Sequence, residues 1–306
     1  MKEQQISRTA LFTAYFRAYH ALHDTPKIFE DFLASNLLTK EESTTMGQKL
    51  ADGLKVFDPA RAALCPDPAT ALAEVIHSHT GAPLILSRAR YTEDTLENAV
   101  RQGVRQYVIL GAGMDTFAFR RKEILDKLQI FEIDHPAMQA FKRRRLNELS
   151  WEQPDQLHFI PVDFTQDSLA TALTSSPYYD PQAVSFFSWL GVTYYLPSDS
   201  VFNTLRALAD IAPVGSTIIF DYYHTDVFIP EKTSKSLQLG MEYLRQIGEP
   251  IITGFDSSTL APDLARLGLG LHENLSPTNI EERYFQKRTD GYHASEHVHF
   301  AQAVVK

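Results

Sequence analysis

Short apolar runs alternate with longer segments of mixed character through the central part of the chain. The runs are rich in β-branched and aromatic residues, which is typical of strands buried on both faces. The longer segments between them, such as 138–149 and 201–211, are expected to form helices. This alternation predicts a parallel sheet with helices on both faces, and therefore an α/β fold. The predicted strands are 107–110, 129–133, 158–162, 183–188 and 216–221.

The segments on either side of this region predict a cap and two more strands. Apolar residues near helical spacing predict helices within 7–64, and the segment that starts at Leu84 leads into a helix ending near Gly103. The last two strands are expected at 269–273 and 298–305. We therefore divide the chain into an N-terminal helical cap and a larger α/β core. The predicted parts are residues 1–83 for the cap, 84–306 for the core, and about 226–250 for a polar, lid-like insert within the core.

The composition and charge are those of an ordinary globular protein. The chain has 306 residues, of which 44% are hydrophobic, and its formal net charge is −9. The one basic run, residues 142–145, falls in a predicted helix, where we interpret it as a solvated face. An acidic chain with no basic patch is not expected to bind nucleic acid.

Cysteine usage and hydropathy favour a reducing cytoplasm. Cys65 is the only cysteine, which excludes an intramolecular disulfide and a cysteine-rich metal site. No run of 18 apolar residues occurs, and the first residues lack the apolar core of a signal peptide, so no membrane association is expected. His293, His297 and His299 lie close in sequence but have no convincing partner ligands, and no metal site is predicted.

A glycine turn follows the first predicted strand. Gly111-Ala112-Gly113 breaks the apolar run, and Asp115 then stands where a helix N-cap would. Glycine has no Cβ, so it permits a tight turn and a close approach of the backbone to a nucleotide-like ligand. Thr116 occupies the place of the third glycine in a dinucleotide-binding fingerprint, which disfavours a nicotinamide cofactor.

Acidic residues end the next two predicted strands. Asp134 follows Gly113 by 21 residues, which suits a carboxylate that accepts hydrogen bonds from ribose hydroxyls. Asp163 and Phe164 end the third strand, and an acid beside an aromatic ring suits an adenine base. Because ligands in such sheets bind at the carboxyl ends of strands, these side chains together predict an adenosine-containing cofactor.

Four segments carry a resemblance to a known family. In order and spacing they resemble the leucine carboxyl methyltransferase family, in particular its bacterial members that act on small metabolites. The likeness runs from about Arg8 to the C-terminus and is strongest over 88–221. It implies a Rossmann-like class I methyltransferase sheet with an antiparallel C-terminal strand, and S-adenosyl-L-methionine as cofactor. The segments are LGAGMDT at 110–116, FEIDHP at 131–136, PVDF at 161–164 and SWLGVTYYLP at 188–197.

The resemblance also implies roles for individual residues. An N-terminal arginine, here Arg17, and a second one, Arg88 in preference to Arg90, are expected near the methionine carboxylate of the cofactor. A planar guanidinium can pair bidentately with a carboxylate. Many family members have a glutamate where this chain has Leu190, and Ser188 or a backbone carbonyl is expected to take its place.

The chemistry of methyl transfer is compatible with three functions. A carboxylate acceptor is already ionised at neutral pH and needs no general base, whereas a hydroxyl acceptor would call for one. The first reading is methyl-ester formation on a small metabolite, of the kind met in secondary metabolism. The second is O-methylation of a hydroxyl on an aromatic or polyketide-like metabolite, and the third is a non-catalytic subunit that binds S-adenosylmethionine. The candidates for the catalytic and acceptor sites are Tyr194, Tyr195 and His224, with His20 and Asp221 as further possible bases.

Overall fold

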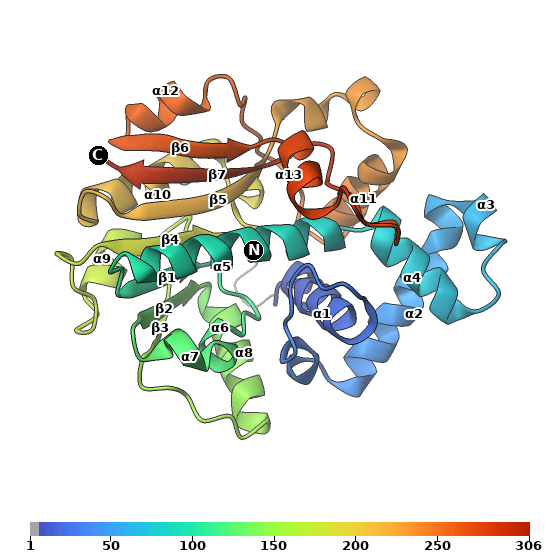
Figure 1. Cartoon of the computed structure of the whole chain (residues 1–306), viewed down its shortest axis with the longest axis horizontal. Helices are drawn as coiled ribbons and strands as arrows, with labels where there is room; N and C mark the ends of the chain where they lie inside the picture. Colours follow the sequence, from blue (N-terminus) through green and yellow to red (C-terminus); the bar gives the residue numbers. More distant parts are fainter. Residues whose placement is uncertain (1–5) are drawn as a thin grey trace.

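A seven-stranded sheet with helices on both faces forms the centre of the protein (Figure 1). The structure, a computed structural model, describes residues 6–306. The strand order is β3-β2-β1-β4-β5-β7-β6. The strands are β1 Gln106–Leu110, β2 Gln129–Asp134, β3 Leu157–Pro161, β4 Ser185–Trp189, β5 Thr217–Tyr223, β6 Leu269–Leu275 and β7 Val298–Val305.

The first five strands are parallel, and β7 inserts between β5 and β6 in the antiparallel sense. The predicted fold class is therefore confirmed, including the antiparallel C-terminal strand. All five residues of β1 are buried because neighbouring strands and both helical layers cover this strand. Its side chains alternate between faces, so Tyr107 and Ile109 join one hydrophobic core, and Val108 and Leu110 join the other.

The predicted helices of the core are present, with shifts of a few residues at their ends. The helix expected to follow Leu84 starts at Ala82, where Pro83 fits the first turn of a helix. A single helical turn, α6, follows the glycine turn. The helices of this part are α5 Ala82–Arg101, α6 Phe117–Arg120, α7 Lys122–Leu125, α8 Pro136–Glu148, α9 Leu169–Thr174, α10 Ser198–Ile211, α12 Leu260–Ala265 and α13 Pro277–Tyr284.

The N-terminal segment packs beside the sheet as a layer of helices. In Figure 1, α1 lies below α5, and α2, α3 and α4 project to the side. Apolar side chains of α1 and α2, such as Phe16 and Leu54, belong to the same hydrophobic core as Tyr107 and Phe186 of the sheet. The cap and the sheet therefore share one core. The cap elements are α1 Arg8–His23, η1 Ala34–Leu37, α2 Lys40–Phe57, α3 Pro59–Ala62 and α4 Pro68–His79.

The segment after β5 contains two short 3₁₀ turns and one helix. These are η3 Thr225–Phe228, η4 Pro230–Lys232 and α11 Lys235–Gln246. No residue of α11 is fully buried, which agrees with a layer added to the outside of the core. The role of this segment as a lid stays a prediction.

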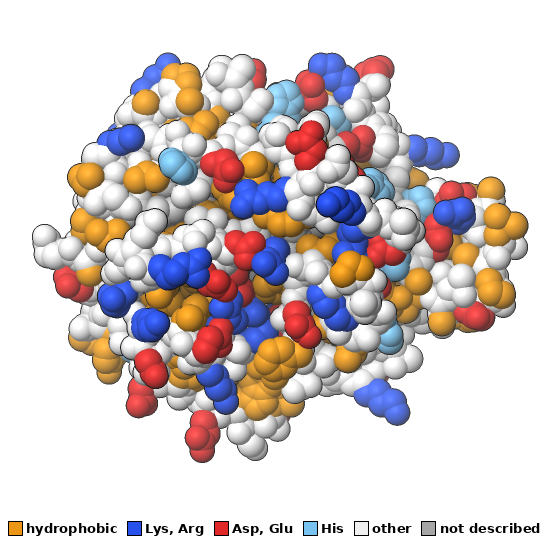
Figure 2. All heavy atoms as spheres, viewed as in Figure 1, with side chains coloured by type: hydrophobic (Ala, Val, Ile, Leu, Met, Phe, Trp, Pro, Cys, Tyr) orange, Lys and Arg blue, Asp and Glu red, His pale blue; other side chains and the backbone are white. Residues whose placement is uncertain are grey.

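The interpretation of the basic run as a solvated face is wrong for two of its four residues. Lys142 is 1% exposed and pairs with Glu132 of β2, with Nζ and Oε2 2.5 Å apart. Arg145 is also buried, and its Nη1 lies 2.9 Å from an oxygen of Glu42 in α2. On the face seen in Figure 2, basic side chains are interspersed with acidic ones. Within 6–306, no helix is both long and apolar enough to cross a membrane.

Candidate active site

A cavity of about 280 Å³ lies at the carboxyl ends of the first four strands. It is bordered by the glycine turn after β1, the ends of β2, β3 and β4, one face of α5, the first half of α1, and the segment 248–250. All nine predicted cofactor-binding residues line this one cavity. They are Arg17, Arg88, Gly111, Ala112, Gly113, Asp134, Asp163, Phe164 and Ser188. Their contacts with a cofactor stay predictions.

The glycine turn has a backbone that other residues rarely adopt. Gly111 and Gly113 have φ angles of +71° and +52°. A Cβ at Gly111 would overlap the side chain of Val192, and a Cβ at Gly113 would come within 3.3 Å of the Cβ of Ala10 in α1. The turn is therefore packed between the β4 turn and the cap, and side chains are kept out of this part of the cavity wall.

Asp134 joins the end of β2 to this turn. Its Oδ2 accepts the backbone N–H of Gly113 at 2.5 Å, and its Oδ1 accepts the N–H of His135 at 2.7 Å. Burial raises the pKa of Asp134, although these two hydrogen bonds oppose the shift. Each carboxylate oxygen can accept more than one hydrogen bond, so the group can still take a pair of ligand hydroxyls.

Asp163 and Phe164 lie at the end of the cavity beside β3. Oδ1 of Asp163 accepts hydrogen bonds from the backbone N–H and the hydroxyl of Thr165, at 2.9 and 2.7 Å. Partial burial opposes ionisation, but these bonds hold the pKa of Asp163 below its usual value. The ring of Phe164 packs 5.8 Å from that of Trp189. The carboxylate of Asp163 can accept a hydrogen bond from the amino group of a planar base, and the ring of Phe164 can pack against that base.

Of Arg88 and Arg90 on α5, only Arg88 lines the cavity. Its Nη1 donates to Oδ2 of Asp221 at 2.7 Å and to the hydroxyl of Tyr194 at 3.1 Å. Burial opposes the charge of Arg88, but Asp221 raises its pKa further above the usual range. Arg90 is exposed and pairs with Asp94 at 2.8 Å.

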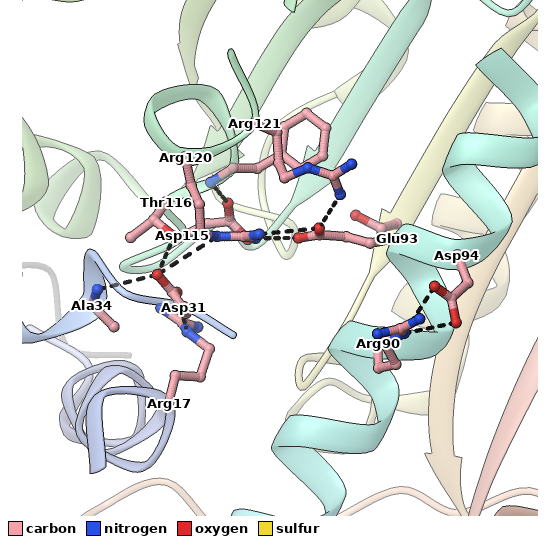
Figure 3. A network of polar contacts seen from close by, with 12 residues as sticks. Arg17, Asp31, Ala34, Arg90, Glu93, Asp94, Asp115, Thr116, Arg120 and Arg121 are labelled. Carbon is pink, nitrogen blue, oxygen red and sulfur yellow. Dashed lines mark hydrogen bonds and ion pairs between the residues drawn. The ribbon is translucent and has the colours of Figure 1, made fainter. Parts of the chain in front are cut away.

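Arg17 reaches the cavity from α1 and is held by a residue that the sequence did not single out. Its Nε donates to Asp31 at 2.9 Å and its Nη2 to the carbonyl of Met114 at 2.6 Å. Figure 3 shows Asp31 at the centre of a network that also includes Thr116 and Arg120. Asp31 therefore links the cap to the glycine turn, although no pattern in the sequence marks it.

Glu249 is a second residue of the cavity wall that sequence reasoning missed. It follows α11, and its carboxylate accepts the backbone N–H groups of Arg8 and Thr9 at 2.8 and 3.2 Å. The hydroxyl of Thr9 donates to it at 2.5 Å. This carboxylate thus fixes the first turn of α1 to the segment after the predicted lid. Partners some 240 positions apart leave no local signal in the sequence.

The three candidates for the catalytic and acceptor sites have different surroundings. Tyr195 lines the cavity, whereas Tyr194 stands behind it and holds Arg88. His224 is not among the residues of the cavity wall. Its Nδ1 accepts the N–H of Asp226 at 3.2 Å, and its Nε2 lies 3.8 Å from Asp256. The geometry therefore gives no support to His224 as a catalytic base.

Ser188 and Leu190 lie at the end of β4, where the resemblance placed a family glutamate. The hydroxyl of Ser188 is buried and lies 2.9 Å from that of Tyr107. Leu190 is partly buried and forms part of the cavity wall. This wall is therefore apolar at position 190, and the hydroxyl of Ser188 is already engaged.

Comparison with known proteins identifies the family of this chain. The chain matches the leucine carboxyl methyltransferase family over residues 10–209. It is 36% identical over 307 residues to the Bacillus subtilis protein YktD, a candidate S-adenosyl-L-methionine-dependent methyltransferase, and the match covers 100% of both chains. A Mycolicibacterium smegmatis protein of the same description is 27% identical over 205 residues, which are 67% of this chain and 62% of that protein.

Two solved structures share the fold over most of the chain. A DUF574 family protein from Streptomyces avermitilis has a TM-score of 0.58 and 11% identity, and covers 96% of this chain and 97% of its own. A candidate methyltransferase from Thermobifida fusca has a TM-score of 0.54 and 14% identity, and the match covers 84% of this chain and 94% of that one. The fold is thus that of class I methyltransferases. The chain belongs to the leucine carboxyl methyltransferase family, as the sequence resemblance predicted.

Proposed function

We propose that this methyltransferase converts a carboxylate of a small metabolite to its methyl ester. The cofactor is S-adenosyl-L-methionine, the methyl donor in the description of the full-length Bacillus subtilis relative. When bound, it supplies a methyl group on a positively charged sulfur, which an acceptor oxygen can displace. The protein then has to align the two reactants and exclude water.

The cavity wall fits this cofactor. The glycine turn offers backbone without side chains, and Asp134 offers a carboxylate that can accept ribose hydroxyl groups. Arg17 and Arg88 are two cations for the carboxylate of the methionine part, and Asp163 with Phe164 would hold the adenine. Each of these assignments is open to test by substitution.

The choice of a carboxylate acceptor rests mainly on one observation, which concerns the three possible bases. His224 lies outside the cavity wall, and Asp221 is fully buried and paired with Arg88. His20 lies in the core of the cap, where its Nδ1 is 2.7 Å from Asp24 and its Nε2 accepts the N–H of Ile28. None of the three is placed to remove a proton from an acceptor hydroxyl. A carboxylate needs no such base.

Tyr195 and His135 of the wall are poorly suited to serve a hydroxyl acceptor as a base. Burial raises the pKa of Tyr195 well above its usual value of 10, so its phenol stays neutral at physiological pH. Among the described residues, His135 is the only histidine in the wall, and it sits between Asp134 and Pro136 at the adenosine end. We propose that Tyr195 instead donates a hydrogen bond to the acceptor carboxylate.

The test uses the chemical stability of the product. The enzyme is incubated with methyl-labelled S-adenosylmethionine and a panel of metabolite carboxylic acids and phenols, and the labelled product is treated with mild alkali. An ester releases labelled methanol, whereas an aryl methyl ether keeps the label. The rate should also be nearly flat from about pH 6 to 8, because a carboxylate is ionised throughout that range.

Label that resists alkali would refute the ester and favour a hydroxyl acceptor. A rate that rises across neutral pH would agree with that outcome, since it would reveal a titrating base. Cofactor binding without transfer to any acceptor of the panel would favour the non-catalytic alternative.

A further inference from the structure

Asp221 lies outside the cavity wall but contacts two parts of it. Its side chain, on β5, is fully buried. Oδ2 accepts Nη1 of Arg88 at 2.7 Å, and Oδ1 accepts the backbone N–H of Gly191 at 2.6 Å. Its backbone carbonyl accepts the hydroxyl of Thr193 at 2.6 Å. One residue thus holds both the arginine on α5 and the turn that follows β4.

The guanidinium of Arg88 is packed directly against that turn. Gly191 has a φ angle of +74°, and a Cβ there would come within 2.9 Å of Cζ of Arg88. The hydroxyl of Tyr194, from the same turn, accepts the second hydrogen bond from Nη1 of the arginine. The orientation of the guanidinium is therefore set by Asp221, Tyr194 and the bare backbone at Gly191.

These contacts use one nitrogen of the guanidinium and leave an edge free. Nη1 carries two hydrogens, and Asp221 and Tyr194 take one each. Among the described residues, Nε and Nη2 of Arg88 have no hydrogen-bond partner. The N–H groups of this edge are parallel and match the two oxygens of a carboxylate.

We propose that Asp221 is a positioning residue that turns the Nε–Nη2 edge of Arg88 toward the carboxylate of the cofactor. Its contact with Gly191 keeps the turn after β4 in register with that edge, so the arginine and the cavity wall move as one unit. The inference rests on the proposed placement of S-adenosylmethionine in this cavity. It also gives Asp221 a task other than that of a base, because its carboxylate is fully buried, paired with Arg88 and outside the cavity wall.

The experiment compares two ligands that differ in the amino-acid end, which carries the carboxylate that Arg88 is expected to bind. S-adenosylhomocysteine carries the amino-acid carboxylate, and 5′-methylthioadenosine shares its adenosine but lacks the amino-acid end. Titration calorimetry is run on the wild-type protein, on Asp221→Asn, and on Asp263→Asn as a control; Asp263 is also paired with an arginine, Arg266, but lies away from the cavity wall. Loss of a charge-assisted partner should weaken S-adenosylhomocysteine binding about tenfold to a hundredfold in Asp221→Asn. Binding of 5′-methylthioadenosine should change less than about twofold, and the control should match the wild type.

Each other outcome counts against the inference. An equal loss for both ligands would mean that Asp221 only supports the fold, and no loss for either would mean that it does not orient Arg88. Failure of the wild type to bind either ligand would overturn the cofactor site itself, and the inference with it. If Asp221→Asn loses its native circular dichroism spectrum, Tyr194→Phe removes the other partner of Nη1 and should again weaken S-adenosylhomocysteine alone. Equal effects of Tyr194→Phe on the two ligands would overturn the proposal.

Discussion

The hydroxyl of Thr116 donates a hydrogen bond to Oδ1 of Asp31 at 2.7 Å, and both side chains are buried. In sequence terms, Thr116 is the residue that replaces the third glycine of a dinucleotide-binding turn. In the fold it is one of the residues through which the N-terminal cap docks onto the glycine turn (Figure 3). Thr116 thus disfavours a nicotinamide cofactor and also links the cap to the turn that borders the proposed S-adenosylmethionine site.

Thr116→Val is expected to destabilise the protein. The change keeps the shape of the side chain but removes a donor from the buried carboxylate of Asp31, which costs about 1–3 kcal/mol. Urea unfolding measures the difference. Thr44→Val, on the exposed face of α2, is the control and should change the free energy of unfolding by less than about 0.5 kcal/mol. Equal stability of the two variants would contradict the docking role of Thr116.

Arg88→Lys should weaken binding of S-adenosylhomocysteine by about tenfold or more. Lysine keeps the charge beside Asp221, so the buried pair is retained, but it cannot present two parallel N–H groups to a carboxylate. Calorimetric titration measures the affinity. Arg90→Lys, two residues along the same helix and exposed, should bind like the wild type. Loss of affinity in Arg90→Lys alone would show that the other arginine serves the cofactor.

Glu249→Gln should release the cofactor product faster. The glutamine is neutral, so its hydrogen bonds with the N–H groups of Arg8 and Thr9 are weaker than those of a carboxylate, by about 1 kcal/mol. If the contact holds α1 over the cavity, the dissociation rate of S-adenosylhomocysteine should rise roughly fivefold in stopped-flow measurements. Glu282→Gln, an exposed residue of α13 outside the cavity wall, should leave the rate unchanged. An unaltered rate in Glu249→Gln would argue against a closing contact.

Stability should fall between pH 6 and pH 8 because of His77. Its Nε2 lies 3.0 Å from Oδ1 of Asp24, and Tyr292 donates to Oδ2 of the same carboxylate at 2.8 Å. Burial opposes the charged form, but the hydrogen bond to Asp24 raises the pKa of His77 above 6.5. A raised pKa in the folded state gives stability that is present below the unfolded value and is lost as the pH rises through the folded one.

The fall in the free energy of unfolding should therefore be smaller in His77→Gln than in the wild type. Urea unfolding at the two pH values measures it, and His272→Gln, which removes an exposed histidine, is the control. A wild-type slope in His77→Gln would show that the pair with Asp24 does not contribute in this range.

The sequence by itself determined the sheet and the end of it at which the site lies. Apolar strands that alternate with helices predict a parallel sheet covered on both faces, and in a parallel sheet the carboxyl ends of the strands lie at one edge. Gly111, Asp134 and Asp163 follow three such strands, so their meeting in one cavity follows from local pattern and topology. A periodicity of 3.6 residues also explains why Arg88 and Arg90, about 200° apart around α5, have different surroundings.

Only the tertiary structure decided which charges are paired and which groups face the cavity. Lys142 and Arg145 are buried because Glu132 and Glu42 meet them across the fold, and no helical pattern contains that information. His224 follows β5 directly, yet it lies outside the cavity wall.

Asp31 and Glu249 enter the site from segments 85 and 241 positions distant from their partners Thr116 and Arg8. Local sequence reports propensity and burial, which depend on near neighbours. The partner of a buried charge is chosen by packing between distant segments, because only a complementary group at hydrogen-bond distance offsets the loss of water.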